Sequence, residues 1–146
     1  MKIFCSRLVL PVLLATALAG CASGPSYTEH AASMQAVSAD KGRIFMYRPS
    51  SFGAAVQPEV RINDDVVGKA KPKGFFYADL PPGDYVVSAS TEAERNLSLS
   101  LAAGEEKYVR LEIKMGAFVG HVKPVLVDAA EGWEELQKMK FIGDQF

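Results

Sequence analysis

The sequence predicts an all-β domain over residues 42–146, an antiparallel β-sandwich of about seven to eight strands with one short C-terminal helix. Three observations support this fold class. Beyond Gly42, apolar and polar residues alternate in short runs, which is the period of a strand with one buried face. Turn-forming Gly, Pro, Asn and Asp separate these runs. Helical periodicity is confined to a short stretch near the end, and the length of 146 residues suits one domain.

The first four strands are expected at 43–48, 59–63, 66–68 and 75–80. Residues 43–48 are apolar on both faces, and Pro49 ends the run. Asn63-Asp64-Asp65 forms the turn between the second strand and the third. In the fourth, we expect Phe76 to be buried together with Ala78 and Leu80, because residues two apart share a face.

Four further strands are expected at 85–90, 95–101, 107–115 and 121–128. Strict alternation predicts that Leu99 and Leu111 are buried, and that Ser98 and Arg110 lie on the opposite, exposed faces. Pro124 marks the last strand as an edge or a bulge, because proline cannot donate to a sheet ladder.

A helix is expected after Asp128, which can cap it together with Glu131 three residues on. Trp133 and Leu136 are then expected to share one face. Gly132 weakens a helix, so two to three turns are predicted.

The first 20 residues have the layout of a secretory signal peptide. Lys2 and Arg7 precede an apolar run of about a dozen residues that ends in small side chains. The run is shorter than the roughly 20 residues that a membrane-spanning helix needs. Leu18-Ala19-Gly20-Cys21 resembles a bacterial lipobox. That resemblance implies cleavage before Cys21 and lipid on its sulfur and its new α-amine, a reaction that requires a nucleophilic thiolate.

A lipid on Cys21 predicts a protein that is attached to a membrane without spanning it, since two or three acyl chains hold a protein stably. The resemblance to bacterial lipoproteins implies that an Asp directly after the lipidated Cys favours retention in the inner membrane. Ala22 and Ser23 follow here, so in a host with two membranes we expect the outer membrane, facing the periplasm. Residues 21–41 are small and polar, and predict the lipidated Cys followed by a flexible tether with a reach of about 25 Å. The alternative within it is a weak helix at 29–38, which would be marginally stable alone.

Charge and composition exclude several function classes. The chain beyond residue 20 holds all 17 acidic and 14 of the 16 basic residues, and its net charge of −3 argues against a nucleic-acid partner. Cys5 leaves with the signal segment and Cys21 carries lipid, so no free thiol is expected in the mature chain. With two His residues besides, the sequence predicts neither a metal site nor a cofactor.

No catalytic residue is predicted. His121 is the domain's one histidine, and no nucleophile motif accompanies it. Carboxylates cluster at 64–65, 92–94 and 105–106, where acidic side chains are also typical of exposed turns. We therefore expect a non-enzymatic binding module. An envelope hydrolase that uses carboxylates or His121 is the alternative, and a structural accessory subunit of a larger envelope assembly is a third.

Two features are candidates for partner contact. Lys69, Lys71 and Lys73 would point the same way on an extended chain and form a cationic tip for anionic headgroups, an envelope protein or cell-wall polymer. The alternative is a charged hairpin that prevents edge pairing. In the loop 49–58, Phe52 places an apolar ring in a polar setting.

The corner Leu80-Pro-Pro-Gly-Asp-Tyr85 resembles that of PEGA-type and transthyretin-like β-sandwich modules, in which a Pro-Gly turn links two antiparallel strands and the next aromatic residue enters the core. The order of motifs from Gly42 to Ile142 is similar to a family of bacterial lipoproteins whose domain has no assigned function. Tyr47-Arg48-Pro49 and Gly132-Trp133 belong to that order. The resemblance implies a fold and a location, and it supplies no catalytic residue.

Overall fold

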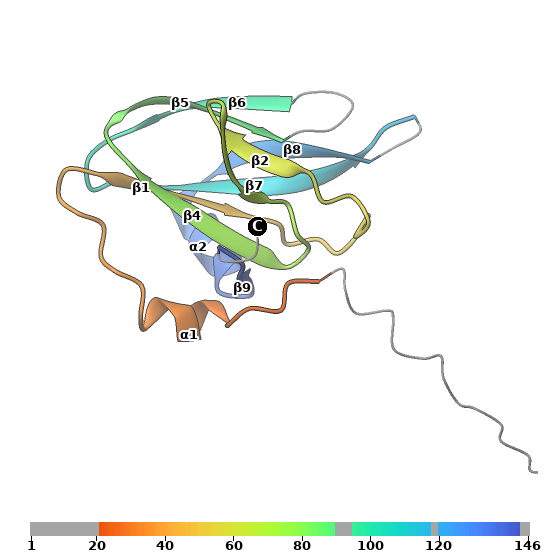
Figure 1. Ribbon diagram of the computed structural model, residues 1–146, viewed down its shortest axis with the longest axis horizontal. Helices are drawn as coiled ribbons and strands as arrows, with labels where there is room; N and C mark the ends of the chain where they lie inside the picture. Colours follow the sequence, from red (N-terminus) through yellow and green to blue (C-terminus); the bar gives the residue numbers. More distant parts are fainter. Residues whose placement is uncertain (1–20, 90–94, 118–119, 144–146) are drawn as a thin grey trace, which may run out of the picture.

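The computed structural model describes residues 21–89, 95–117 and 120–143, which form two sheets packed face to face (Figure 1). The predicted all-β sandwich is confirmed, with nine strands in the described residues. The predicted signal segment 1–20 and the carboxylates of 92–94 lie outside the described residues.

One sheet has five strands in the order β8-β7-β1-β4-β9, and the other has four in the order β3-β2-β5-β6. The first comprises β8 (Gly120–Val127), β7 (Glu106–Met115), β1 (Gly42–Tyr47), β4 (Gly74–Leu80) and β9 (Lys140–Phe141). The second comprises β3 (Asp65–Lys69), β2 (Glu59–Ile62), β5 (Gly83–Ala89) and β6 (Arg95–Leu101). We call them the five-stranded and the four-stranded sheet.

Two strand pairs are parallel, which the sequence pattern did not indicate. β1 runs parallel to β7, and β4 runs parallel to β9. Neither pair is joined by a hairpin, because the chain crosses between the sheets before it returns. The Leu80–Tyr85 corner is one such crossing, and it carries the chain from β4 to β5 in the other sheet rather than closing a hairpin.

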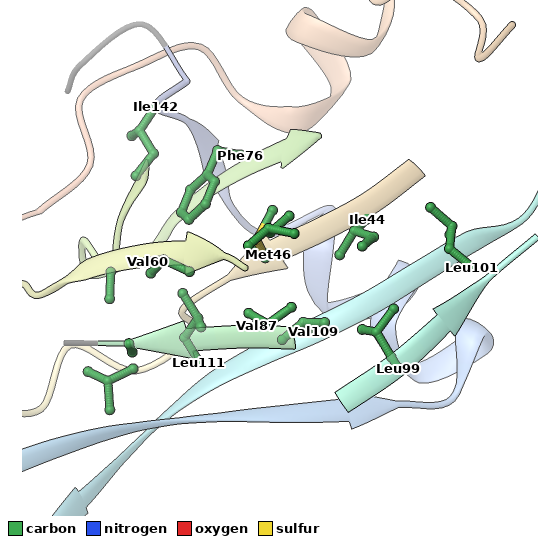
Figure 2. Close-up of a cluster of buried hydrophobic side chains, with 14 of the residues drawn as sticks. Ile44, Met46, Val60, Phe76, Val87, Leu99, Leu101, Val109, Leu111 and Ile142 are labelled. Carbon is green, nitrogen blue, oxygen red and sulfur yellow. The ribbon is translucent and has the colours of Figure 1, made fainter. Parts of the chain in front are cut away.

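The core between the sheets is built from alternating strand residues, as predicted. Ile44 and Met46 of β1 lie between the sheets with Phe76 of β4 (Figure 2). Leu99 from β6 is 7% exposed, and Leu111 from β7 is fully buried. Ser98, between two inward-facing residues of β6, is exposed, which confirms the face assigned to that strand.

Truncation of either core leucine tests these faces. Leu99→Ala or Leu111→Ala should lower the free energy of unfolding by about 2–5 kcal/mol, through lost burial and the cavity left behind. Ser98→Ala is the matched control on the exposed face and should change it by at most about 0.5 kcal/mol. Urea unfolding followed by circular dichroism measures all three, and equal losses at positions 98 and 99 would show that the β6 faces are wrongly assigned.

A second apolar cluster covers the outer face of the five-stranded sheet. Phe45, Tyr47, Phe75 and Tyr108 point away from the first core, and Leu136 of helix α2 (Ala129–Leu136) packs on them. This explains why β1 is apolar on both faces. The five-stranded sheet is therefore the middle layer of the molecule.

Helix α2 begins at the predicted cap, with the Asp128 carboxylate accepting a hydrogen bond from the Ala130 N–H at 2.9 Å. The expected pairing of Glu131 with this cap is replaced by its contact with Arg110. Glycine is required at position 132, because a Cβ there would lie 2.4 Å from the Cβ of Tyr108. The absence of a side chain lets the helix approach the sheet. The two residues expected to share a face differ in burial, since Trp133 is 49% exposed while Leu136 is buried.

Arg110 is not the exposed residue that the alternation predicted. Its guanidinium lies under α2 and donates to Glu131 at 2.7 Å and to Glu135 at 3.1 Å. The Glu135 carboxylate also accepts the Tyr47 hydroxyl at 2.6 Å. Burial, followed by this hydrogen bond to a carboxylate, raises the pKa of Tyr47. These polar contacts hold the helix to the sheet.

Residues 22–37, named the N-terminal strap here, are packed on the domain and do not form the predicted flexible tether. Tyr27 of helix α1 (Tyr27–Ala31) and Met34 pack on the second cluster, and the His30 ring stacks on Phe141 at 3.6 Å between centroids. The strap's backbone also joins β9, since the Phe141 N–H donates to Pro25 and the Tyr27 N–H donates to Met139. Figure 1 shows α1 below the five-stranded sheet.

Candidate functional site

The predicted lipid-attachment residue lies at one end of the sandwich, directly beside the domain. Cys21 is exposed, whereas the next residue, Ala22, is only 6% exposed. The Ala22 N–H donates to the carbonyl of Pro72 at 2.9 Å, in the turn between β3 and β4. The chain is therefore fixed to the domain one residue after Cys21.

Arg48, at the end of β1, organises this end of the molecule. Its side chain has no exposed surface, and all of its N–H groups are used. The five carbonyl acceptors are Ser50 (3.2 Å), Phe52 (2.8 Å), Gly53 (3.0 Å), Val56 (2.6 Å) and Ala70 (2.7 Å). One guanidinium thus joins the loop 49–58 to the turn after β3.

The hydrogen-bond partners of the Arg48 guanidinium are all uncharged. Its five hydrogen bonds go to backbone carbonyls, and burial lowers the pKa of Arg48 below its ordinary value, with the nearby Cys21 acting in the opposite direction. The position of Arg48 before Pro49 marked only a strand end in the sequence. Its role was missed because backbone acceptors leave no residue pattern to find.

The three lysines do not lie on one extended strand. Lys69 ends β3, and the chain then turns, with the Lys71 N–H donating to the Lys69 carbonyl at 2.8 Å. Lys73 adopts a left-handed backbone conformation with φ of 60°. The argument that alternate residues point the same way therefore fails beyond Lys69, although Lys69 and Lys73 are exposed and Lys71 is partly exposed.

Phe52 is exposed as predicted, with 59% of its surface accessible. Its loop is not loose, because Arg48 binds the Phe52 carbonyl and the Phe52 N–H donates to the Ser50 hydroxyl at 3.1 Å. An apolar ring is thus presented from a backbone that is held in place.

Among the described residues, the groups that a hydrolase would need are not brought together. His121 is the second residue of β8, and its Nδ1 is buried with no hydrogen-bond partner in this part of the chain. In the part of the chain that the structure covers, no three His, Cys, Asp or Glu side chains gather as a metal site would require. Glu105 pairs with Lys107 at 2.7 Å, and Glu106 accepts the Tyr108 hydroxyl at 3.0 Å, so both carboxylates serve local structure.

We call Cys21, the loop 49–58 and the turn 69–73 the anchor-end face, because the Ala22 N–H bonds to Pro72 in that turn and Arg48 joins the turn to the loop. Within 21–89, 95–117 and 120–143, no helix is long and apolar enough to cross a bilayer.

These features define a two-sheet β-sandwich domain whose exposed cysteine immediately precedes its first fixed residue. The chain belongs to the family described as "Protein of unknown function (DUF2846)", whose model matches residues 38–123. A protein of Haemophilus influenzae, described as an uncharacterized protein, is 29% identical over 131 residues. The match covers 86% of this chain and 78% of the relative, so it includes part of the strap as well as the sandwich.

Proposed function

We propose that the protein is a lipid-anchored protein of the bacterial envelope, attached through Cys21 and acting as a non-enzymatic binding or accessory domain. The observation that carries the proposal is the position of Cys21, which is exposed at the edge of the domain and ends a lipobox-like sequence. A residue that receives lipid must be accessible, and the fixed Ala22 beside it does not obstruct its side chain.

Two further observations support this reading. Among the described residues, no partner orients the Nδ1 of His121 as a catalytic imidazole would require, which favours a binding role over hydrolysis. Tyr85 donates its hydroxyl to the Pro81 carbonyl at 2.7 Å and packs against the inter-sheet core. This contact supports the proposed likeness of the corner to PEGA-type and transthyretin-like modules.

Replacement of Cys21 tests the anchor. Cys21→Ser should abolish incorporation of a clickable fatty acid in growing cells, because an alcohol does not replace the thiolate in lipid transfer. Cys5→Ser is the matched control, and should label like the wild type. Equal labelling of the Cys21 variant and the wild type would contradict the proposal.

The second expectation concerns the membrane. With Ala22 and Ser23 after the lipidated residue, the protein should fractionate with outer-membrane markers on a density gradient when expressed in a host with two membranes. Ala22→Asp introduces the residue that favours inner-membrane retention and should move the protein to inner-membrane fractions. Recovery of the wild type with inner-membrane markers would contradict the assignment.

A further inference from the structure

The lipid anchor proposed above, combined with the fixed position of Ala22, decides which surface of the domain meets the membrane. A flexible twenty-residue tether would let the domain turn in any direction at about 25 Å from the bilayer. Instead, one residue separates the lipid from a backbone hydrogen bond to Pro72, and one residue spans only about 3.5 Å. The surface around Cys21 is therefore held at the level of the lipid headgroups.

The chemistry of that surface fits a bilayer. Phe52 is an exposed aromatic ring on a loop whose backbone is held by Arg48, so its insertion does not require ordering of the loop. Aromatic rings are favoured at the boundary between headgroups and acyl chains. Lysines near an anionic membrane surface are attracted to it.

Charge distribution points to the same orientation. The chain beyond residue 20 has a net charge of −3, yet Lys69 and Lys73 are exposed beside Cys21. Lys140, also exposed, lies next to them because its N–H donates to the Lys73 carbonyl at 2.9 Å. Glu59, the strand neighbour of Lys69, pairs with Arg61 at 2.7 Å. An acidic domain would be repelled by an anionic membrane unless its basic end faced it.

We propose that the anchor-end face lies flat against the bilayer, with Phe52 in the interface and Lys69 and Lys73 beside anionic phospholipid headgroups. The residues that the sequence marked as contacts for a protein or a polymer are then membrane contacts. The opposite end of the sandwich, where the turn 102–105 lies next to the start of β1, faces away from the membrane.

Site-specific fluorescent labels on the full lipidated protein test this orientation. The label is placed at Phe52→Cys or, as a control at the opposite end, at the exposed Ala103→Cys. The protein is reconstituted in vesicles of phosphatidylethanolamine and phosphatidylglycerol that contain a headgroup spin-labelled lipid. Quenching at position 52 should exceed quenching at position 103 by about threefold or more, since only the first position lies in the interface.

Charge reversal tests the headgroup contact. In the Phe52→Cys background, K69E with K73E should lower the quenching at position 52 in these vesicles, and the effect should shrink at high salt and in phosphatidylcholine vesicles. K41E with K107E makes the same change of charge at two partly exposed lysines at the opposite end of the sandwich, and should leave the quenching unchanged. Equal effects of the two pairs would overturn the role of Lys69 and Lys73.

The outcomes also separate this inference from the anchor itself. Equal quenching at positions 52 and 103, in protein that still floats with the vesicles, overturns the orientation and leaves the lipid anchor intact. A second outcome would also overturn the inference. If lipid quenching at position 52 is weak, and purified cell-wall polymer shields the label there from the solvent, the face binds the polymer instead. Failure to float with vesicles, together with a reactive thiol at Cys21, would overturn the proposed function.

Discussion

Replacing Arg48 with methionine should lower the free energy of unfolding by about 3–5 kcal/mol. The variant removes every donor from five carbonyls that one buried guanidinium now satisfies. A buried carbonyl without a donor has lost its hydrogen bonds to water and has no hydrogen bond within the protein to replace them. The loss is measured by urea unfolding at constant ionic strength.

Two controls distinguish this network from a general effect of charge. Arg61→Met removes a half-exposed arginine that pairs with Glu59 on the surface, and should cost about 1 kcal/mol or less. Arg48→Lys keeps the charge but supplies only three donors, all from one nitrogen atom. It should therefore still lower the free energy of unfolding by more than Arg61→Met does. If Arg48→Met were as mild as Arg61→Met, the guanidinium would not be what holds the loop 49–58 in place.

Removal of the N-terminal strap should be the second large effect. A variant that begins at residue 40 should be less stable than one that begins at residue 22 by about 3–6 kcal/mol, because burial of each large side chain contributes about 1.5–3 kcal/mol. Deletion removes Tyr27 and Met34 from the second cluster and uncovers Phe75 and Phe141. The backbone hydrogen bonds to β9 are lost as well.

The comparison uses urea unfolding of both variants, and dye binding to detect newly exposed apolar surface. Within the longer variant, Tyr27→Ala should reproduce part of the loss, whereas Thr28→Ala, at an exposed position of the same helix, should not. Equal midpoints for the two lengths would mean that the strap is a tether after all.

The strands were predictable because each has a simple period. Leu99 and Leu111 are buried where alternation placed them, and the two apolar faces of β1 are explained by the two clusters that cover them. The assignment of strands to sheets was not predictable in this way. The corner at Pro81-Pro82-Gly83 has hairpin chemistry, but the direction of the next strand is decided by tertiary packing, and the chain crosses to the other sheet.

The composition of the N-terminal strap did not indicate that it packs on the domain. Its small and polar residues are typical of a linker, yet Tyr27, Ala31 and Met34 recur at helical spacing and Ser26 with Glu29 forms a capping box. These signals are weak alone, because a five-residue helix is unstable without tertiary contacts. The stabilising partner is β9, more than a hundred residues further along the chain, and pattern analysis of the strap itself does not include it.

The residues of the candidate site were likewise only partly predictable from the sequence. The sequence supplied Cys21 and the exposed Phe52, since a lipobox-like motif and a lone aromatic in a polar loop are local features. Arg48 and the fixed Ala22 were not predictable, because both act through backbone atoms of distant segments. The Ala22 contact fixes the chain to the domain directly after Cys21, where a long flexible tether was expected.

The intact mass of the protein extracted from membranes tests the central claim most directly. The account predicts a chain that begins at Cys21 and carries a diacylglyceryl group on the sulfur and an acyl group on the α-amine, so that its mass exceeds that of residues 21–146 by the mass of these lipids. Mild base should release the ester-linked chains and leave the amide-linked one. A mass equal to the unmodified chain, with a Cys21 thiol that reacts with a maleimide, would contradict the account.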